Sequence, residues 1–271
     1  MRHRTLKVLI HGAGTMLGRR RLVKIARLVT NEARLDVEND IRHNGETIVQ
    51  RVARTEAEPV IFDVGCHFGE WSLSLLREPG FEPILHAFEP SAYSFGRASA
   101  ALAGRGTVHR LALSDKPGAA ELAIVHEGAG SNSLVPFTED RASGETELVP
   151  LSTIDQFCAE GDLHHVTLLK IDAEGHDLAI LEGAKEMLAR QAISMVQFEY
   201  NSRWIDARRF LLDAFILLQA SGYRMGKVTP RGVETYERWH PELESFREAN
   251  FLGYLQPWAD TLPTLPWWGP A

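Results

Sequence analysis

Two apolar runs that end beside a polar turn constrain this chain most. Residues 168–171 are followed by Asp172, and residues 60–64 lead into a turn that contains Gly65. Short, nearly continuous apolar runs are typical of strands buried on both faces of a parallel sheet. Open α/β sheets bind their ligands outside the carboxyl ends of such strands. We therefore expect Gly65 and Asp172 to lie at the ligand-binding edge of one sheet.

Strand-like and helix-like segments alternate through the middle of the chain. The predicted strands are residues 60–64, 84–88, 108–113, 166–171, 194–200, 223–228 and 251–255, and the predicted helices are 71–76, 93–102, 153–157, 178–188 and 208–221. This alternation predicts an α/β fold in which helices connect parallel strands. The turn-rich residues 116–150 interrupt it, and we expect a hairpin or a flap there.

The same pattern divides the chain into three parts. We expect an N-terminal helical extension at residues 1–58 and a main domain at residues 59–256. Residues 257–271 are rich in Pro and Trp and are expected to form an irregular surface tail. The length of 271 residues and the apolar content of 44% suffice for one large α/β domain.

The charge of the chain is unevenly distributed. Its net charge is −7, although residues 1–30 contain eight basic and no acidic residues. The acidic remainder would repel a phosphate backbone, so we expect no nucleic-acid partner. The basic segment is expected to be solvated, or to contact anionic lipid, an acidic substrate or the partner subunit of a homodimer.

The cysteines and the apolar runs indicate the compartment. Cys66 and Cys158 are the only cysteines, which predicts no disulfide framework and a reducing environment. The sequence has no apolar run of 18 or more residues, and its short apolar stretch at 8–10 lacks the features of a signal peptide. We therefore expect a cytoplasmic protein without an integral membrane segment.

Residues 63–69 form a D-x-G-x-x-x-G turn between a predicted strand and a predicted helix. Gly65 allows the backbone to approach a ligand closely, and Gly69 allows the next helix to pack nearby. We interpret Cys66 as a small residue in a tight place, because no base is paired with it. The candidate cofactor-binding residues of this turn are Asp63, Gly65, Cys66, His67, Phe68 and Gly69.

The next two predicted strands also end in polar residues. Glu89 and Pro90 follow the second strand, where an acid suits the hydroxyls of a ribose. Ser114 and Asp115 follow the third, where a short polar side chain can meet the amino group of adenine. Together with Gly65 these residues outline an adenosine-shaped site.

The cofactor predicted for this site is S-adenosylmethionine. The turn lacks the G-K-[ST] sequence of a P-loop, so a phosphate cradle is not expected. A sulfonium and a zwitterionic amino acid suit nearby carboxylates, whereas phosphates would be repelled. Residues 12–18 have the spacing G-x-G-x-x-x-G and leave open an NAD(P)-dependent oxidoreductase. A non-catalytic adenosine-binding protein is the other alternative.

These motifs resemble those of the FkbM-type S-adenosylmethionine-dependent methyltransferases. The resemblance covers about residues 58–202 and rests on the segments 62–69, 87–90, 112–115, 169–177, 181–184 and 197–201. The Lys-Ile-Asp-Ala-Glu-Gly-His segment at 170–176 is the most specific part, and Cys66-His67 departs from the family's usual Ala-Asn. The resemblance implies a class I methyltransferase fold, a Rossmann-like, seven-stranded, mostly parallel sheet with helices on both faces. It also implies methyl transfer mainly to oxygen, often on sugars or natural products.

Methyl transfer to a hydroxyl requires that the acceptor be positioned and lose its proton. Asp172, Glu174 and His176 are the candidate catalytic residues, because each could accept that proton beside the cofactor. Mg²⁺ could instead lower the pKa of the hydroxyl. Its candidate ligands are Asp172, Glu199 and Asn201, because oxygen donors suit this ion.

The acceptor is expected to be a small molecule. Arg203, Trp204 and the flap at residues 126–140 are the candidate walls of its pocket. Asp172 is expected to contact both the cofactor and this acceptor, since it ends the predicted strand between them.

Overall fold

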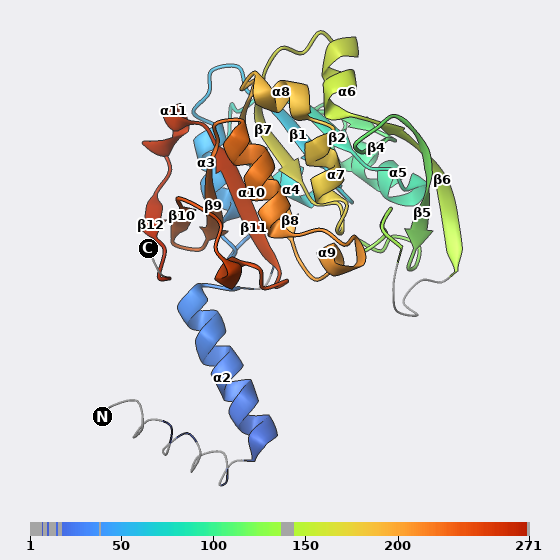
Figure 1. Ribbon diagram of the computed structural model, residues 1–271. Coiled ribbons are helices and arrows are strands. Elements are labelled where there is room, and N and C mark those ends of the chain that lie inside the picture. Colours follow the sequence, from blue (N-terminus) through green and yellow to red (C-terminus); the bar gives the residue numbers. More distant parts are fainter. Residues whose placement is uncertain are drawn as a thin grey trace. The chain divides into compact units, whose positions relative to one another are not determined.

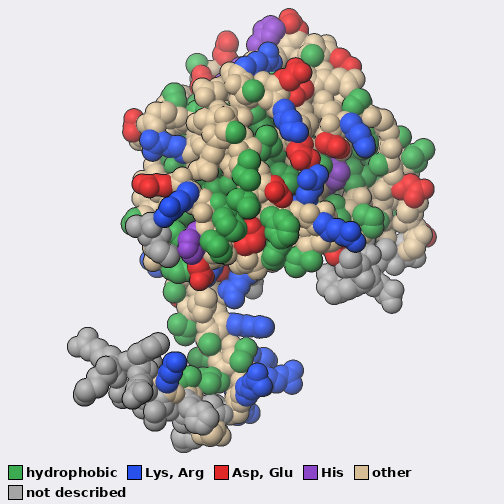
Figure 2. All heavy atoms as spheres, viewed as in Figure 1, with side chains coloured by type: hydrophobic (Ala, Val, Ile, Leu, Met, Phe, Trp, Pro, Cys, Tyr) green, Lys and Arg blue, Asp and Glu red, His purple; other side chains and the backbone are tan. Residues whose placement is uncertain are grey.

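The computed structural model describes residues 7, 10, 15, 18–37, 39–136 and 144–269. The chain divides into two compact units, Met1–Val37 and Glu38–Ala271. The first unit contains helix α2 (Arg19–Arg34), none of whose residues is buried. Both basic and apolar side chains are exposed along this helix (Figure 2). Across the described residues, no helix has the length and apolar character needed to cross a membrane.

A nine-stranded sheet forms the centre of the second unit, counted over the described residues (Figure 1). Its parallel part has the order β3 (Thr107–His109), β2 (Ile84–Phe88), β1 (Val60–Val64), β7 (Val166–Ile171) and β8 (Ile193–Tyr200). It continues through β11 (Ala249–Tyr254), β9 (Arg224–Thr229), β10 (Gly232–Tyr236) and β12 (Thr264–Pro266). Strand β11 is antiparallel to both β8 and β9. The expected mostly parallel α/β sheet is confirmed, and it carries two more strands than the seven expected.

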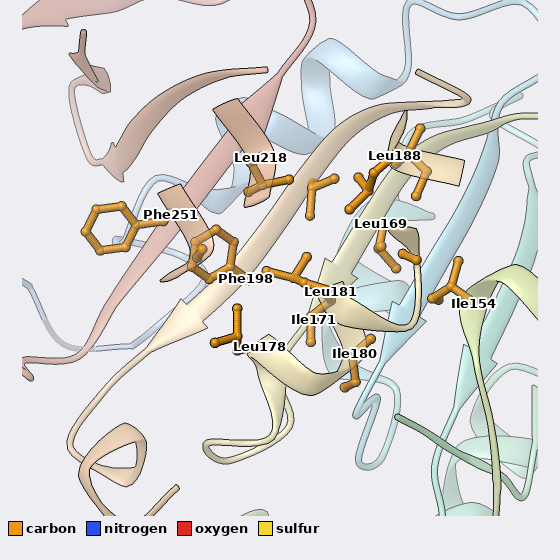
Figure 3. Packing of buried hydrophobic residues seen from close by; sticks show 14 of the residues in the cluster. Ile154, Leu169, Ile171, Leu178, Ile180, Leu181, Leu188, Phe198, Leu218 and Phe251 are labelled. Atoms are coloured by element: carbon orange, nitrogen blue, oxygen red, sulfur yellow. The ribbon is translucent and has the colours of Figure 1, made fainter. Parts of the chain in front are cut away.

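The central strands are buried along their whole length. Every residue of β7 and β8 is buried, which explains why both sequences are rich in apolar residues. One face of the sheet is covered by α6 (Ile154–Glu160), α7 (Asp177–Glu182), α8 (Lys185–Ala189) and α10 (Leu211–Ala220), whose apolar side chains pack together as Figure 3 shows. The other face is covered by α3 (Glu46–Ala53), α4 (Glu70–Leu75), α5 (Ala92–Ala101) and α11 (Gln256–Ala259). Helices therefore lie on both faces, as expected.

A second sheet of three strands stands beside the main one in the described part of the chain. It consists of β4 (Ala112–Leu113), β6 (Glu145–Ser152) and β5 (Gly118–Ile124). The strand predicted at 108–113 is therefore split, because β3 pairs with β2 whereas β4 pairs with β6. The segment that follows β5 forms the expected flap, of which residues 137–143 lie outside the described residues.

Two predicted helices begin or break at positions that the sequence pattern does not reveal. The helix predicted at 178–188 is interrupted at Gly183 and Ala184. Position 183 requires glycine, because a Cβ there would lie 2.0 Å from the backbone oxygen of Ser114. The Asp155 carboxylate then accepts the backbone N–H groups of Glu186 and Met187 and caps α8. The helix predicted at 208–221 is α10, preceded by α9 (Arg203–Asp206) and followed later by the 3₁₀ turn Pro241–Leu243.

Both ends of the main domain differ from the expected boundaries. Helix α3 falls within the expected extension at 1–58, yet Val49, Val52 and Ala53 are buried in the core on one face of the sheet. The tail at 257–271 was expected to be irregular, and this is wrong where the structure describes it. Residues Thr264–Pro266 form β12, which pairs with β10, and the ring of Trp267 packs against that of Tyr236.

Candidate active site

The turn after β1 and the loop after β7 meet at the point where the strand order reverses. The chain runs from β1 outward through β2 and β3 and returns to the other side of β1 as β7. Ligands bind in this crevice in open α/β sheets. Gly65 has φ +75°, and a Cβ on it would lie 1.8 Å from the backbone oxygen of Asp172. Only glycine permits this approach, which confirms that the two predicted strand ends adjoin.

Two adjoining pockets open at this crevice. The larger has a volume of about 750 Å³, within the range of small-molecule sites. The smaller pocket lies beside β4 and the carboxyl end of β2, and its lining includes Glu89 and Pro90. The residues that line both pockets are Gly65, His67, Gly130, Asp172 and Glu174. The predicted positions Gly65, Glu89 and Asp172 therefore share one hollow.

The smaller pocket combines an apolar wall with a buried carboxylate. Glu89 accepts the backbone N–H groups of His67 at 3.0 Å and Ser91 at 2.9 Å. Burial raises the pKa of Glu89 to about 7. The amide nitrogen of Asn132, on the flap, is buried and has no hydrogen-bond partner within the described structure. The apolar wall is formed by Val64, Phe88, Leu111, Leu113, Leu122, Leu134 and Ile180.

The third strand contributes differently from what we expected. The Ser114 hydroxyl donates to Asp115 at 3.0 Å and lies 2.9 Å from the Nε2 of His176. Asp115 is exposed, and neither it nor Ser114 lines the smaller pocket; Leu111, Ala112 and Leu113 do. The Ser114–Asp115 pair thus lies outside the lining of the smaller pocket, and its contact with adenine stays a prediction.

His176 lines only the smaller of the two pockets. Burial in this pocket lowers the pKa of His176 to about 4. Its ring is therefore neutral near pH 7 and is bound to Ser114. Because His176 stays outside the lining of the larger pocket, its role as the base beside the acceptor remains a prediction.

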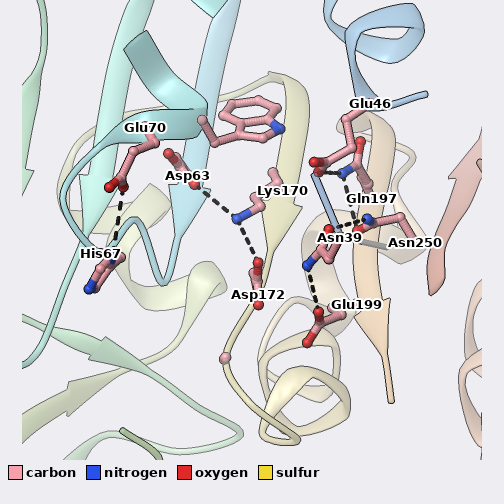
Figure 4. Close-up of polar contacts among 12 residues, drawn as sticks. Asn39, Glu46, Asp63, His67, Glu70, Lys170, Asp172, Gln197, Glu199 and Asn250 are labelled. Atoms are coloured by element: carbon pink, nitrogen blue, oxygen red, sulfur yellow. Dashed lines mark hydrogen bonds and ion pairs between the residues drawn. The ribbon is translucent and has the colours of Figure 1, made fainter. Parts of the chain in front are cut away.

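A buried lysine links the two strand ends. Lys170 on β7 lies 3.2 Å from a carboxylate oxygen of Asp172 and 3.6 Å from one of Asp63 on β1 (Figure 4). Burial would lower the pKa of Lys170, but the Asp172, Asp63 and Glu46 carboxylates outweigh it, so the net shift is upward. Asp63 also accepts the Ser72 hydroxyl at 2.6 Å and is fully buried. Asp63 does not line the larger pocket, but it holds Lys170, which does.

Three carboxylates converge in the larger pocket. Ligand oxygens of Asp172, Glu174 and Glu199 lie within 4.8 Å of one another. Burial raises the pKa of Glu174 to about 8, with the Asp172 and Asp177 charges adding to the shift. Burial and the same neighbours also hold the pKa of Glu199 well above its usual range.

The candidate metal ligands that lie close together thus include Glu174 in place of the expected Asn201. Asn201 donates its amide N–H to Glu199, and its amide oxygen accepts the backbone N–H of Arg203 at 2.8 Å. The carbonyl that a metal would need is therefore already bound. Asn39 donates to the other Glu199 oxygen at 2.9 Å (Figure 4).

The loop after β7 is held in an unusual conformation. Glu174 and Gly175 both have positive φ, 51° and 91°. The buried Asp177 carboxylate accepts the backbone N–H groups of Ala173 at 3.2 Å and Gly175 at 3.0 Å. This brace fixes the position of Glu174, and a left-handed glutamate at a pocket is the kind of strain that functional sites carry.

The flap is tied to the crevice by three contacts. His67 Nε2 lies 3.0 Å from the Gly128 oxygen, and the Ser133 hydroxyl donates to the Glu174 backbone oxygen at 2.8 Å. Arg203 donates to the backbone oxygen of Val135 at 2.6 Å and lines the larger pocket, as expected. Trp204 was expected to form a wall as well, but it is fully buried and donates to the backbone of Glu199. That expectation is wrong.

The remaining residues of the first turn separate into two groups. Cys66 is buried and lines the larger pocket, and burial raises the pKa of its thiol well above the usual range. Phe68 and Gly69 line neither pocket. Phe68 stacks on His67 with ring centroids 3.7 Å apart, and Gly69 leaves room for Leu102.

Sequence reasoning missed several residues of the larger pocket. Among them are Asn39, Glu46, Trp71 and Lys170. Glu46 is buried on α3 and accepts the Gln197 amide, while Asn44 donates to its other oxygen at 2.9 Å. A charged residue inside an otherwise apolar strand, as at Lys170, was the signal that could have found one of them.

The comparisons with known proteins agree with this architecture. A family model described as the methyltransferase FkbM domain matches residues 63–225. No curated protein is significantly similar to the chain. The oxidoreductase alternative rested on residues 12–18, which lie outside the matched region and mostly outside the described residues.

Several solved structures are distantly similar. An FkbM methyltransferase from Methylobacillus flagellatus KT is 16% identical, with 73% of this chain and 44% of that chain covered and a TM-score of 0.43. A precorrin-6y C5,15-methyltransferase from Geobacter metallireducens GS-15 is 12% identical, with 78% and 87% covered and a TM-score of 0.42. A SAM dependent methyltransferase from Aquifex aeolicus is 12% identical, with 78% and 88% covered and a TM-score of 0.40.

The chain spans less than half the length of the first of these proteins. The family model itself covers more than half of the present chain and includes both strand ends that form the crevice. The chain therefore belongs to the FkbM family of S-adenosylmethionine-dependent methyltransferases.

Proposed function

We propose that this methyltransferase methylates a hydroxyl oxygen of a small, uncharged acceptor such as a sugar or a natural product. The observation that carries the proposal is the junction of the two pockets, where Asp172 and Glu174 line both. A methyl donor held in the smaller pocket and an acceptor in the larger one would meet at these carboxylates.

The residues of the hollow fit S-adenosylmethionine. Glu89 is placed to accept hydrogen bonds from ribose hydroxyls. The unpartnered amide N–H of Asn132 in the same pocket can donate to the adenine ring. The indole N–H of Trp71 is buried in the larger pocket without a partner among the described residues and can serve the carboxylate of the methionine end. When bound, this cofactor supplies an electrophilic methyl group on a sulfonium, whose positive charge suits Asp172 and Glu174.

Glu174 is the best candidate for the general base that accepts the proton of the acceptor hydroxyl. Its carboxyl lies in the larger pocket, and a pKa of about 8 places its titration close to working pH, where general bases are most effective. Asp172 is paired with Lys170, so its charge is held and its role is to orient the acceptor hydroxyl. The proton of the acceptor hydroxyl would pass to a Glu174 oxygen while the hydroxyl oxygen bonds to the methyl carbon. The bond between that carbon and the sulfonium sulfur would break, and S-adenosylhomocysteine would leave.

The acidic lining of the larger pocket favours a hydroxyl-rich acceptor. Its acidic lining residues outnumber the basic ones, which are Lys170 and Arg203 and which are both engaged by carboxylates. A hydroxyl-rich acceptor can donate hydrogen bonds to the carboxyl oxygens of these residues. The acidic lining residues are Glu46, Glu70, Asp172, Glu174, Glu199 and Glu248.

The carboxylate cluster also suggests a second route to the same product. Oxygen ligands are those that Mg²⁺ prefers, and Asp172, Glu174 and Glu199 are close enough to share one ion. An ion there would lower the pKa of an acceptor hydroxyl. Removal of metal with a chelator separates the routes, since the Glu174 route predicts an unchanged rate and the metal route predicts its loss.

The test combines cofactor binding with an acceptor screen. Titration calorimetry with S-adenosylhomocysteine should give one site per chain, and a screen with hydroxyl, amine and carboxylate acceptors should give turnover with the hydroxyls. Turnover with amines alone would contradict O-methylation. Binding without turnover on any acceptor would favour the non-catalytic alternative.

A further inference from the structure

Helix α2 separates its apolar and basic side chains on two sides. Leu22, Ile25, Ala26, Val29 and Ala33 recur at intervals of three or four residues, so they lie along one side of the helix. The residues Arg20, Lys24 and Arg27 recur at the same intervals on the opposite side. This arrangement is typical of helices that lie on an interface.

Within the described part of its own unit, α2 leaves its apolar side uncovered. No residue of α2 is buried, and Ile25 and Val29 are 47% and 63% exposed. Leu28, which follows Lys24 by four residues and lies outside the apolar side, is 69% exposed. Isolated helices of this length are marginal in water, and their stability comes from covering an apolar face. A surface that meets this helix would therefore both cover the face and stabilise the helix.

The charge of α2 identifies that surface. Its sequence contains Arg19, Arg20, Arg21, Lys24 and Arg27 before its first acid, Glu32. A second copy of the helix would bring like charges together, and a nucleic acid would leave the apolar side uncovered. An anionic lipid bilayer meets both needs, because its headgroups attract the basic side chains and its acyl boundary accepts the apolar ones.

We propose that α2 binds the surface of an anionic membrane and lies parallel to it, with Leu22, Ile25 and Val29 facing the acyl chains. The basic residues contact the headgroups. This inference is independent of the acceptor and of the carboxylate chemistry, so it can fail while the proposed function holds, and the reverse.

Flotation of the full chain with vesicles tests the proposal. Vesicles of phosphatidylcholine alone are compared with vesicles that also contain phosphatidylglycerol, at low and at high salt. The chain should float with the anionic vesicles and dissociate as salt rises. A triple variant, Arg20→Gln with Lys24→Gln and Arg27→Gln, should lose about a hundredfold in affinity, since each basic residue contributes about 5-fold.

Two further variants make the outcome specific. Leu22→Asp with Val29→Asp should abolish binding although every basic residue remains. A matched control, Lys116→Gln with Lys185→Gln and Arg231→Gln, removes three exposed basic residues of the second unit and should bind as the wild type does. No binding to anionic vesicles, equal binding to both vesicle types, or equal loss in the control would overturn the proposal. The proposal would also be overturned if the wild-type chain bound no vesicles but formed a dimer that the double variant Leu22→Asp with Val29→Asp does not form.

Discussion

The ammonium of Lys170 lies 3.2 Å from the carboxylate of Asp172, two residues further along the chain, where β7 has ended and the next loop begins. The same ammonium lies 3.6 Å from Asp63 on the neighbouring strand. One buried cation thus compensates the charges of both strand ends that form the crevice.

Replacement of Lys170 by Met should destabilise the protein strongly. The variant leaves Asp63 and Asp172 without their cation, and breaking a buried pair in this way costs about 3 to 5 kcal/mol. Urea unfolding measures the loss. Because Asp63 is the fully buried partner, Lys170→Met with Asp63→Asn should recover part of it. Equal stability of Lys170→Met and the wild type would mean that the pair contributes nothing.

Replacement of Gly65 by Ala should abolish cofactor binding. The new Cβ would meet the Asp172 backbone oxygen, which is 1.8 Å away, so the two loops must separate. S-adenosylhomocysteine affinity should fall at least about tenfold, which is about 1.4 kcal/mol. Gly80→Ala is the matched control, because Gly80 has φ +79° but nothing within 4 Å of the added atom. It should cost about 1 kcal/mol of stability and leave affinity unchanged.

The rate of methyl transfer should depend on pH through Glu174. Because the pKa of this carboxyl is raised to about 8, its ionised form, which accepts the proton, grows as pH rises. The value of kcat/KM should therefore increase about tenfold per pH unit below pH 8 and level off above it. Glu174→Gln should lower kcat about a hundredfold or more and remove this rise. A Glu174→Gln variant with the wild-type profile would assign the base to another group.

Stability should fall in acid partly through His109. This ring stacks on Phe88 and lies 3.0 Å from His86, and burial lowers the pKa of His109 to about 4. The unfolded chain therefore binds a proton that the folded chain does not, so stability is lost as pH falls from about 6.5 to about 4. His109→Gln should make the dependence of unfolding free energy on pH shallower in this window. An unchanged slope would show that the ring is protonated in the folded state.

The sequence was most predictive where burial is uniform. Strands β1 and β7, which are buried almost throughout, begin and end at the predicted residues, because buried strands appear as apolar runs with sharp ends. Strand β2 also has the predicted ends, although Ile84 at its start is exposed. The junction of Gly65 with Asp172 followed from the same ends, since parallel strands place their carboxyl termini at one edge. Family resemblance rested on these same segments.

The sequence was least predictive where a role depends on orientation. His176 and Glu174 are two residues apart, yet the left-handed backbone at Glu174 lets its side chain reach the larger pocket while His176 lines the smaller one. Strand β12 depends on pairing with β10, which local pattern does not encode. Ser114 also illustrates this limit, because its hydroxyl is engaged by a histidine 62 residues away.

A crystal structure of the protein with S-adenosylhomocysteine tests the central claim most directly. The account predicts that the ribose contacts Glu89, the base occupies the smaller pocket, and the sulfur points toward Asp172 and Glu174. Glu199 would then face an open acceptor space. A ligand bound elsewhere, or one whose sulfur points away from these carboxylates, would contradict the account.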